Sequence, residues 1–169
     1  MAGRFDAYEH LEQFPLDDEV RERLCREQLE CVVAWTNRDG WPVAVTHWFV
    51  WHDGRFWVTS TPQRKRVPAL RSRPESCVVV SSAGTELGPA RTATAKTRAT
   101  VHDDDATKAW FFPALAERAW GHDPAEKARF EEMLFGTDRV VIELEPLMWI
   151  TYDAMKMWQA VQEPGTVGG

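Results

Sequence analysis

Two Asp-Gly pairs punctuate a long apolar stretch in the first third of the chain. The stretch, CVVAWTNRDGWPVAVTHWFVWHDGRFWVTS, is rich in Val, Trp, Phe and Thr, and Asp39-Gly40 and Asp53-Gly54 separate its apolar runs. Gly takes the positive φ that tight turns need, so Asp-Gly between apolar runs is typical of hairpins. The pattern predicts antiparallel strands at about 30–36, 41–51 and 55–61. The middle strand is apolar on both faces, so we expect both faces to be covered.

Helical patterns precede and follow these strands. Val20 and Leu24 are four residues apart in PLDDEVRERLCREQLE, which predicts a short amphipathic N-terminal helix. KRVPALRSRP predicts a second short helix, with Pro68 in its first turn and Pro74 ending it.

Two longer helical segments follow further along the chain. Asp103–Asp105 begin the first, as favourable charge at a helix N-terminus, and Pro113 is expected to break or kink it. The second has Asp123 as its N-cap, Pro124 at its first position and Gly136 at its C-terminal stop.

The remaining segments are extended. SCVVVSS (76–82) and RTATAKTRATVH (91–102) predict two strands, and DRVVIELEPLMWITYD (138–153) predicts one or two more. Antiparallel strands with few helices favour a mainly β fold with α additions, built as a small barrel. We expect a single domain over 1–169, with a short N-terminal helix, a helical insertion at about 103–136 and a disordered tail, QEPGTVGG.

Charge and composition narrow the function. The net charge of -6 argues against a protein that coats nucleic acid. We find no apolar signal core, no membrane-length apolar run, no zinc-finger spacing and no HExxH. Three Cys residues at irregular spacing favour reduced thiols. These observations predict a soluble cytoplasmic protein without a metal site.

A basic run interrupts this acidic chain directly after the third predicted strand. Arg64, Lys65 and Arg66 follow the hydroxyls of Thr59, Ser60 and Thr61 and lead into the helix fixed by Pro68. Arg presents a planar fork that matches phosphate oxygens, so this segment predicts a phosphate pocket. The alternative interpretation is a solvated basic loop, which is what charge runs usually are.

The ordered set of motifs resembles the pyridoxamine 5'-phosphate oxidase-like, flavin-binding split β-barrel superfamily, over about residues 20–146. The motifs that carry the resemblance are Asp39-Gly40-Trp41-Pro42, Thr46-His47-Trp48-Phe49, Asp53-Gly54, Ser60-Thr61, Arg64, Arg66, Leu70 and Pro74. The resemblance implies an antiparallel split barrel, a homodimer and a cofactor cleft between the subunits. The substrate-phosphate motifs of the pyridoxamine phosphate oxidases themselves are not evident, so that particular reaction is not implied.

The resemblance also implies roles for single positions. Arg64 and Arg66 would bind the cofactor phosphate with Lys65 in support, and Thr59, Ser60 and Thr61 would contact the ribityl-phosphate part. The backbone of Thr46, His47 and Trp48 would face the ring. FMN is the expected cofactor and the deazaflavin F-420 the alternative. Two interpretations of Arg71 and Arg73 stay open: they serve the acidic tail of F-420, or they are surface residues of the predicted helix, which is the favoured interpretation.

The expected function is an FMN- or F-420-dependent oxidoreductase that exchanges hydride or electrons with a small organic substrate. No acid, base or nucleophile stands out as catalytic, so the chemistry is assigned to the cofactor. His47 is either a ring-facing hydrogen-bond donor or a satisfied barrel residue. Two alternatives stay open: a carrier, sensor or storage protein without turnover, and a haem-binding barrel with His47 and His102 as its only conceivable ligands.

Overall fold

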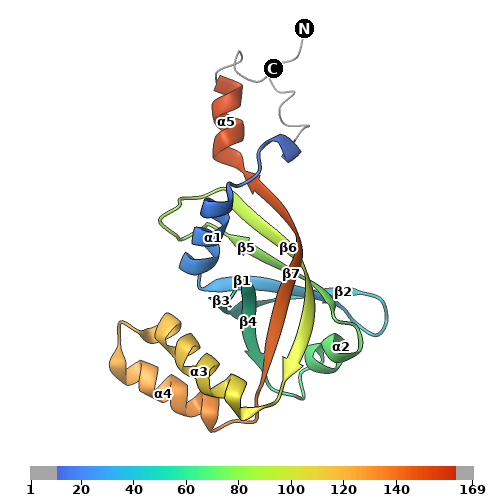
Figure 1. The fold of residues 1–169 in the computed structure, drawn as a ribbon, viewed down its shortest axis with the longest axis vertical. Coiled ribbons are helices and arrows are strands. Elements are labelled where there is room, and N and C mark those ends of the chain that lie inside the picture. The colour runs from blue at the N-terminus through green and yellow to red at the C-terminus, as the bar shows by residue number, and fades with distance from the viewer. Residues whose placement is uncertain (1–10, 163–169) are drawn as a thin grey trace. The chain divides into compact units, whose positions relative to one another are not determined.

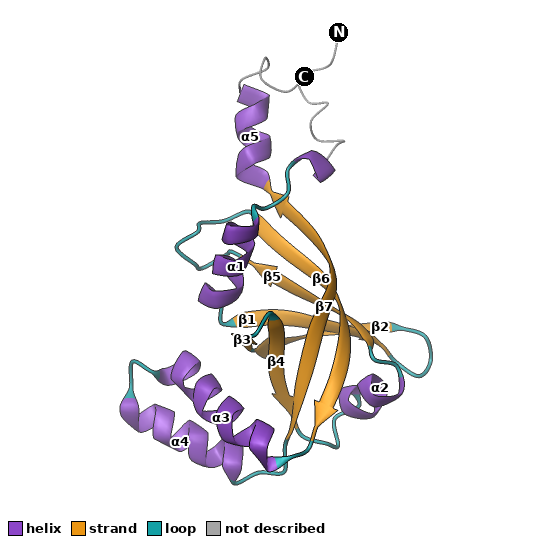
Figure 2. Ribbon diagram, in the orientation of Figure 1, coloured by secondary structure: helices purple, strands orange, loops and turns teal. Residues whose placement is uncertain are grey.

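The computed structural model describes residues 11–162 and contains one antiparallel sheet, with helices before, between and after its strands along the chain (Figures 1 and 2). The predicted mainly β fold with α additions is therefore confirmed, whereas the predicted disordered tail lies almost wholly outside the described residues. The strand order is β2-β1-β5-β6-β7-β4-β3. The strands are β1 (Glu30–Thr36), β2 (Pro42–Trp48), β3 (Val50–His52), β4 (Arg55–Ser60), β5 (Glu75–Ser81), β6 (Arg91–His102) and β7 (Val140–Asp153).

The four predicted helices are present, and the structure adds a C-terminal helix and an N-terminal 3-10 turn. No helix among residues 11–162 has both the length and the apolar character to cross a bilayer. The helices are α1 (Asp18–Glu27), α2 (Arg66–Ser72), α3 (Asp105–Trp120), α4 (Pro124–Phe135), α5 (Ala154–Gln162) and the 3-10 turn η2 (Leu11–Gln13).

The chain divides into two compact units, which we describe separately. The larger unit comprises residues 29–79 and 95–148, and the smaller one comprises the described residues of 1–28, 80–94 and 149–169. In the smaller unit, α1 buries Leu24 completely, and Phe14 packs with Met157 and Val161 of α5. Asp153, which is buried, accepts hydrogen bonds from the backbone N–H groups of Met155 and Lys156 in α5 and pairs with Arg91 at 3.0 Å.

Both Asp-Gly turns of the larger unit close hairpins, as predicted. β1 pairs with β2 in antiparallel register, and β3 pairs with β4 across the two-residue turn Asp53-Gly54. Gly54 has φ +71° and Asp53 has φ 49°, the left-handed conformation that such a turn requires. The predicted strand 41–51 is interrupted at Phe49, which is fully buried and donates its backbone N–H to the Leu29 carbonyl outside the sheet ladder.

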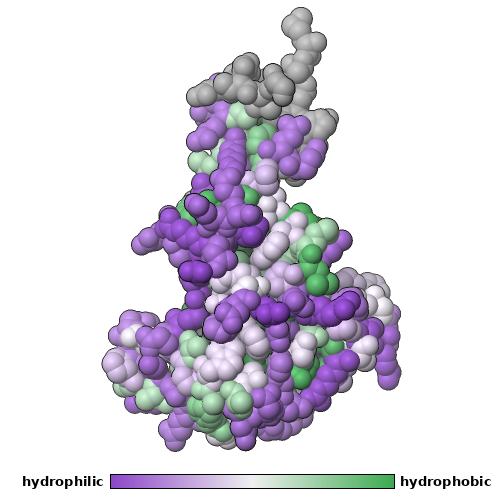
Figure 3. Space-filling view, in the orientation of Figure 1, coloured by the Kyte–Doolittle hydropathy of each residue, from purple (hydrophilic) through white to green (hydrophobic). Residues whose placement is uncertain are grey.

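The α3–α4 hairpin, residues 105–135, forms a helical layer beside the strands of the larger unit. The two helices run side by side (Figure 2), and α3 buries Phe111, Phe112 and Leu115 against Leu134 of α4 and Val50 of β3. Asp104 caps α3 through the backbone N–H of Thr107, and Asp123 caps α4. Helix α3 continues through Pro113 rather than breaking there. Hydrophobic residues also reach the surface over this hairpin (Figure 3), and Met133 and Phe135 are exposed.

Candidate functional site

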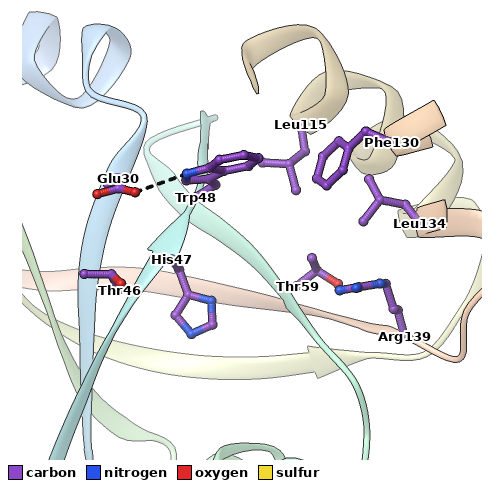
Figure 4. A pocket seen from close by; sticks show the side chains of 9 residues that line it. All are labelled: Glu30, Thr46, His47, Trp48, Thr59, Leu115, Phe130, Leu134 and Arg139. Carbon is purple, nitrogen blue, oxygen red and sulfur yellow. Dashed lines mark hydrogen bonds between the residues drawn. The ribbon is translucent and has the colours of Figure 1, made fainter. Parts of the chain in front are cut away.

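A cavity of about 290 Å³ lies in the larger unit between strand residues and the α3–α4 hairpin (Figure 4). We call it the Trp48 cavity. Its volume is at the lower end of the range for small-molecule sites, roughly 300–1,000 Å³. It is lined by Glu30, Thr46, His47, Trp48, Thr59, Leu115, Phe130, Leu134 and Arg139.

The strand side of the cavity is polar and is held by backbone pairing. Thr46, His47 and Trp48 form the end of β2, where they pair with the first residues of β1. Thr59 of β4 donates its hydroxyl to the Val140 carbonyl at 2.8 Å. The indole N–H of Trp48 donates to the Glu30 carboxylate at 3.2 Å, which fixes the ring across the cavity (Figure 4).

The helical side of the cavity is apolar. Leu115 comes from α3, and Phe130 and Leu134 come from α4. The Trp48 ring packs edge-on against Phe130, with centroids 5.6 Å apart, and against Trp120 at 6.3 Å. Aromatic pairs of this kind add about 0.5–1.5 kcal/mol beyond the area they bury. The wall is therefore continuous with the core, against which Trp48 and Phe130 pack.

Arg66 of the predicted basic segment contacts His47, which lines this cavity. A terminal nitrogen of Arg66 lies 2.7 Å from His47 Nε2, and its guanidinium stands over the Trp35 ring, 5.7 Å from the centroid. Arg is always a donor, so His47 Nε2 accepts and the His47 proton is assigned to Nδ1. Burial, and then the Arg66 charge, lower the pKa of His47 to about 4, so the imidazole is neutral at neutral pH.

Three arginines gather here from two distant segments. Burial lowers the pKa of Arg66 and of Arg139, and the charge of Arg64 lowers both further. Within residues 11–162, none of the three forms an ion pair with a carboxylate. Arg66 and Arg139 are half-buried, whereas Arg64 is exposed. Half-buried cations without a counter-charge are costly, and an anion shared among the three arginines relieves that cost. The arrangement therefore has the chemistry of an anion site.

The structure separates other predicted site residues from this group. Lys65 lines a second cavity, of about 770 Å³, which we call the Trp35 cavity; its further lining residues are Trp35, Asn37, Arg38, Asp39, Val43, Pro68, Ala69, Ser72 and Arg73. Ser60 is buried and donates to the Thr61 carbonyl, and alternation along β4 puts Ser60 and Thr59 on opposite faces. Thr61 accepts from the Arg64 backbone in the turn before α2.

Several residues weighed from the sequence have other partners. Arg71 pairs with Asp103 at 2.5 Å, whereas Arg73 donates to the Thr36 carbonyl and lines the Trp35 cavity. His102 Nε2 lies 2.8 Å from the Glu143 carboxylate. Among the residues the structure describes, no group of three or more His, Cys, Asp or Glu side chains is arranged to hold a metal ion.

Sequence reasoning missed Arg139, Glu30 and the three hairpin residues of the Trp48 cavity. Glu30 is the first residue of β1, and Arg139 directly precedes β7. In the sequence both look like ordinary charged residues at strand ends. Leu115, Phe130 and Leu134 look like core. The one available signal was Arg139 beside the apolar run Val140–Ile142, and only the fold brings it to Thr59, as Figure 4 shows.

Comparisons with known proteins agree with this architecture. Among solved structures, a conserved hypothetical protein, Rv2991 from Mycobacterium tuberculosis, is 16% identical with a TM-score of 0.71, covering 92% of this chain and 94% of that one. An F420 reductase is 24% identical with a TM-score of 0.57, covering 76% and 94%. The haem storage protein HutZ from Vibrio cholerae is 16% identical with a TM-score of 0.58, covering 83% and 99%.

At these identities the solved structures establish the fold, which is the split β-barrel predicted from the motifs. No match was found among curated proteins. The family model described as pyridoxamine 5'-phosphate oxidase matches residues 16–152, which is most of the chain. The chain therefore belongs to the pyridoxamine 5'-phosphate oxidase family.

Proposed function

We propose that this protein is an oxidoreductase that holds a phosphate-bearing flavin-type cofactor, FMN or F-420, at Arg64 and Arg66. The observation that carries the proposal is the arginine cluster, which has no carboxylate partner among the described residues, beside a cavity lined by hydroxyls and a tryptophan. Guanidinium groups suit phosphate, and an indole suits a flat ring. Family membership supports the proposal, because flavin-type cofactors are what the resemblance implies.

The residues present fit such a cofactor. Arg64 and Arg66 would hold the phosphate, Thr59 would contact the ribityl part, and the β2 residues Thr46–Trp48 would lie along the ring. When bound, the cofactor supplies hydride or electron transfer. The protein would position the cofactor: His47 fixes the Arg66 guanidinium that holds the phosphate. Trp48 and the α3–α4 hairpin would exclude water from one side of the site.

The choice between FMN and F-420 depends on what lies beyond the phosphate. Arg66 stands between the two cavities, because His47 lines one and Trp35 lines the other. An acidic tail would meet Lys65 and Arg73 in the Trp35 cavity, whereas Arg71 is already paired with Asp103. F-420 has such a tail, so a strong preference of the protein for F-420 over FMN would assign the Trp35 cavity to that tail.

We further propose that the working form is a homodimer. The arginine cluster lies beside a cavity of only about 290 Å³, which is too small to enclose a whole cofactor, so a second subunit would complete the cofactor cleft. Apolar side chains of the larger unit are exposed in the turn between β1 and β2 and on β7. Trp41 in the turn is 69% exposed, and Leu147 and Met148 on β7 are 57% and 46% exposed. A solution mass of two chains by light scattering is expected, and a stable monomer that binds cofactor would refute the shared cleft.

The haem-binding alternative has one structural neighbour, HutZ, in its favour. The two histidines considered as ligands already have Nε2 engaged, His47 with Arg66 and His102 with Glu143. Ligation through Nε2 would have to displace these partners. For this reason we place the flavin-type function first, and a Soret band in the purified protein would reverse that order.

Fluorescence titration of the purified protein with FMN and with F-420 tests the proposal. Binding of one of them in the micromolar range is expected, and the double variant R64A/R66A is expected to lose it by at least about 100-fold. The variant R98A/R129A removes the same charge from two exposed arginines and serves as the matched control. Absence of binding to both cofactors would refute the function. Binding without repeated reduction and reoxidation by any organic acceptor would favour the carrier or sensor alternative.

A further inference from the structure

The Trp48 cavity combines an apolar wall with one guanidinium. Leu115, Phe130, Leu134 and Trp48 form the wall, and Arg139 is the only Lys or Arg among its lining residues. Arg64 and Arg66 do not line it. Ligand sites of this composition bury an apolar body and orient it with a few polar groups. The cavity is therefore built differently from the arginine pair on the segment before α2.

Arg139 is fixed in place yet retains donors. Its Nε donates to the Thr137 hydroxyl at 2.9 Å, and one terminal nitrogen lies 3.4 Å from the Met133 sulfur. No carboxylate pairs with it within residues 11–162, and no hydrogen bond is found from its other terminal nitrogen. Figure 4 shows the guanidinium extended across the cavity beside Thr59. A half-buried guanidinium held this way presents its fork to a ligand.

The opposite side of the cavity has the opposite charge. The Glu30 carboxylate, which accepts from the Trp48 indole at 3.2 Å, lies across the cavity from Arg139 (Figure 4). An anionic group is repelled there and attracted at Arg139. A ligand with one acidic end would thus enter in one orientation, with its apolar body along Trp48 and Phe130.

We propose that the Trp48 cavity binds an organic acid with an apolar body, an aryl or alkyl carboxylate, and that Arg139 binds its carboxylate. This inference rests on the proposed function, since it names the class of substrate that the cofactor site serves. The α3–α4 hairpin then sets the size and shape of the apolar body. Because Leu134 and Leu115 belong to the core, this wall is preformed rather than closed on binding.

Calorimetric titration of the purified full-length protein with 2-naphthoate and with neutral 2-naphthamide tests the assignment. The acid is expected to bind about tenfold to 100-fold more tightly than the amide, as charge-assisted hydrogen bonds predict. R139Q should abolish that difference, and R139K should retain part of it. F130A should weaken acid and amide equally. R129Q, on the exposed face of α4 where Arg129 pairs with Glu126, should change neither.

The outcomes separate this inference from the cofactor proposal. Equal binding of acid and amide, absence of acid binding, or an unchanged preference in R139Q would overturn it whether or not FMN or F-420 binds. The titration is repeated with saturating FMN or F-420, and acid binding should survive. If the cofactor competes with the acid, or if R139Q loses cofactor as severely as R64A/R66A while still preferring the acid, the cavity and Arg139 belong to the cofactor instead.

Discussion

The two cavities of the larger unit differ most in what their polar groups already do. In the Trp35 cavity, Asn37 accepts two backbone N–H bonds of its own turn, Arg73 donates to the Thr36 carbonyl, and Ser72 donates to carbonyls of α2. In the Trp48 cavity, Arg139 retains donors and has no carboxylate partner in the part of the chain that the structure describes. The larger space, about 770 Å³ against about 290 Å³, also has Arg38, Asp39 and Lys65 in its wall, but these three side chains are exposed to solvent, whereas Arg139 is half-buried.

This comparison teaches that chemistry, rather than volume, identifies the better candidate for the reaction. A polar side chain that closes a turn or caps a helix has spent its hydrogen-bonding capacity on the fold. Arg66 stands between the two spaces and is held by His47 on one side and Trp35 on the other. Substitution of Arg139 in the Trp48 cavity should therefore alter ligand binding, whereas substitution of Asn37 or Ser72 in the Trp35 cavity should mainly alter stability.

The largest expected effect is the loss of stability when a leucine in the wall of the Trp48 cavity is truncated. Leu134 is 1% exposed and belongs to both the wall and the core cluster. Leu134→Ala should lower the free energy of unfolding by about 3 kcal/mol, as is typical for buried leucines. Val43→Ala, in the wall of the Trp35 cavity, should cost about 1 kcal/mol because Val43 is only half-buried. Urea unfolding measures the free energy of unfolding of both variants. Equal losses would contradict the inference that Leu134 in the wall of the Trp48 cavity belongs to the core and that Val43 in the wall of the Trp35 cavity does not.

The next effect distinguishes the cofactor affinity lost with Arg66, which lies between the two cavities, from that lost with Arg73 of the Trp35 cavity. Arg66→Ala should weaken FMN or F-420 binding by about 10- to 100-fold, because it removes charge-assisted hydrogen bonds to phosphate. Arg73→Ala should change FMN affinity less than about threefold, since its donors serve the Thr36 carbonyl. Fluorescence titration compares the two variants under one salt concentration. A larger loss of FMN from Arg73→Ala would place the phosphate on the Trp35 side.

Much of the fold was predictable because local rules agreed with the final structure. The Asp53-Gly54 turn, the Pro124 helix start and the α2 start before Pro68 each follow from backbone conformations that few residues adopt. The break at Phe49 was not predictable, since it depends on a hydrogen bond to Leu29 that exists only after the chain folds. The continuation of α3 through Pro113 was also missed, because burial of Phe111, Phe112 and Leu115 outweighs one lost hydrogen bond.

The candidate site was predictable only in its local part. The charge of Arg64 lowers the pKa of both Arg66 and Arg139, so the three lie close together, whereas Lys65 lines the Trp35 cavity. Arg139 was missed because its neighbours in sequence carry no motif; sheet pairing of β4 with β7 brings it beside Thr59. Proximity of this kind depends on strand register, which a single sequence does not reveal.

A smaller effect concerns pH and His47. The pKa of His47 is lowered from 6.5 to about 4, so between these values the unfolded chain binds a proton that the folded one does not. Its contribution to stability is complete above about pH 6.5 and is lost as the pH falls toward 4, by up to about 2 kcal/mol. His47→Gln keeps an acceptor for Arg66 but does not titrate. Urea unfolding at pH 7 and 4.5 should therefore show a smaller pH loss in the variant, and identical losses would contradict the assignment.

The smallest effect concerns Asn37, which lines the Trp35 cavity. The Asn37 side-chain oxygen accepts the backbone N–H groups of Asp39 and Trp41, both at 2.9 Å, and thereby closes the turn that contains Gly40. Asn37→Ala leaves both donors without this partner, so about 1 kcal/mol of stability should be lost. Asn37→Asp retains the acceptor and serves as the control. Because the turn is committed to the fold, FMN affinity in Asn37→Ala should stay within about twofold of the parent protein, whereas loss of FMN comparable to that in Arg66→Ala would show that the turn itself forms part of the cofactor site.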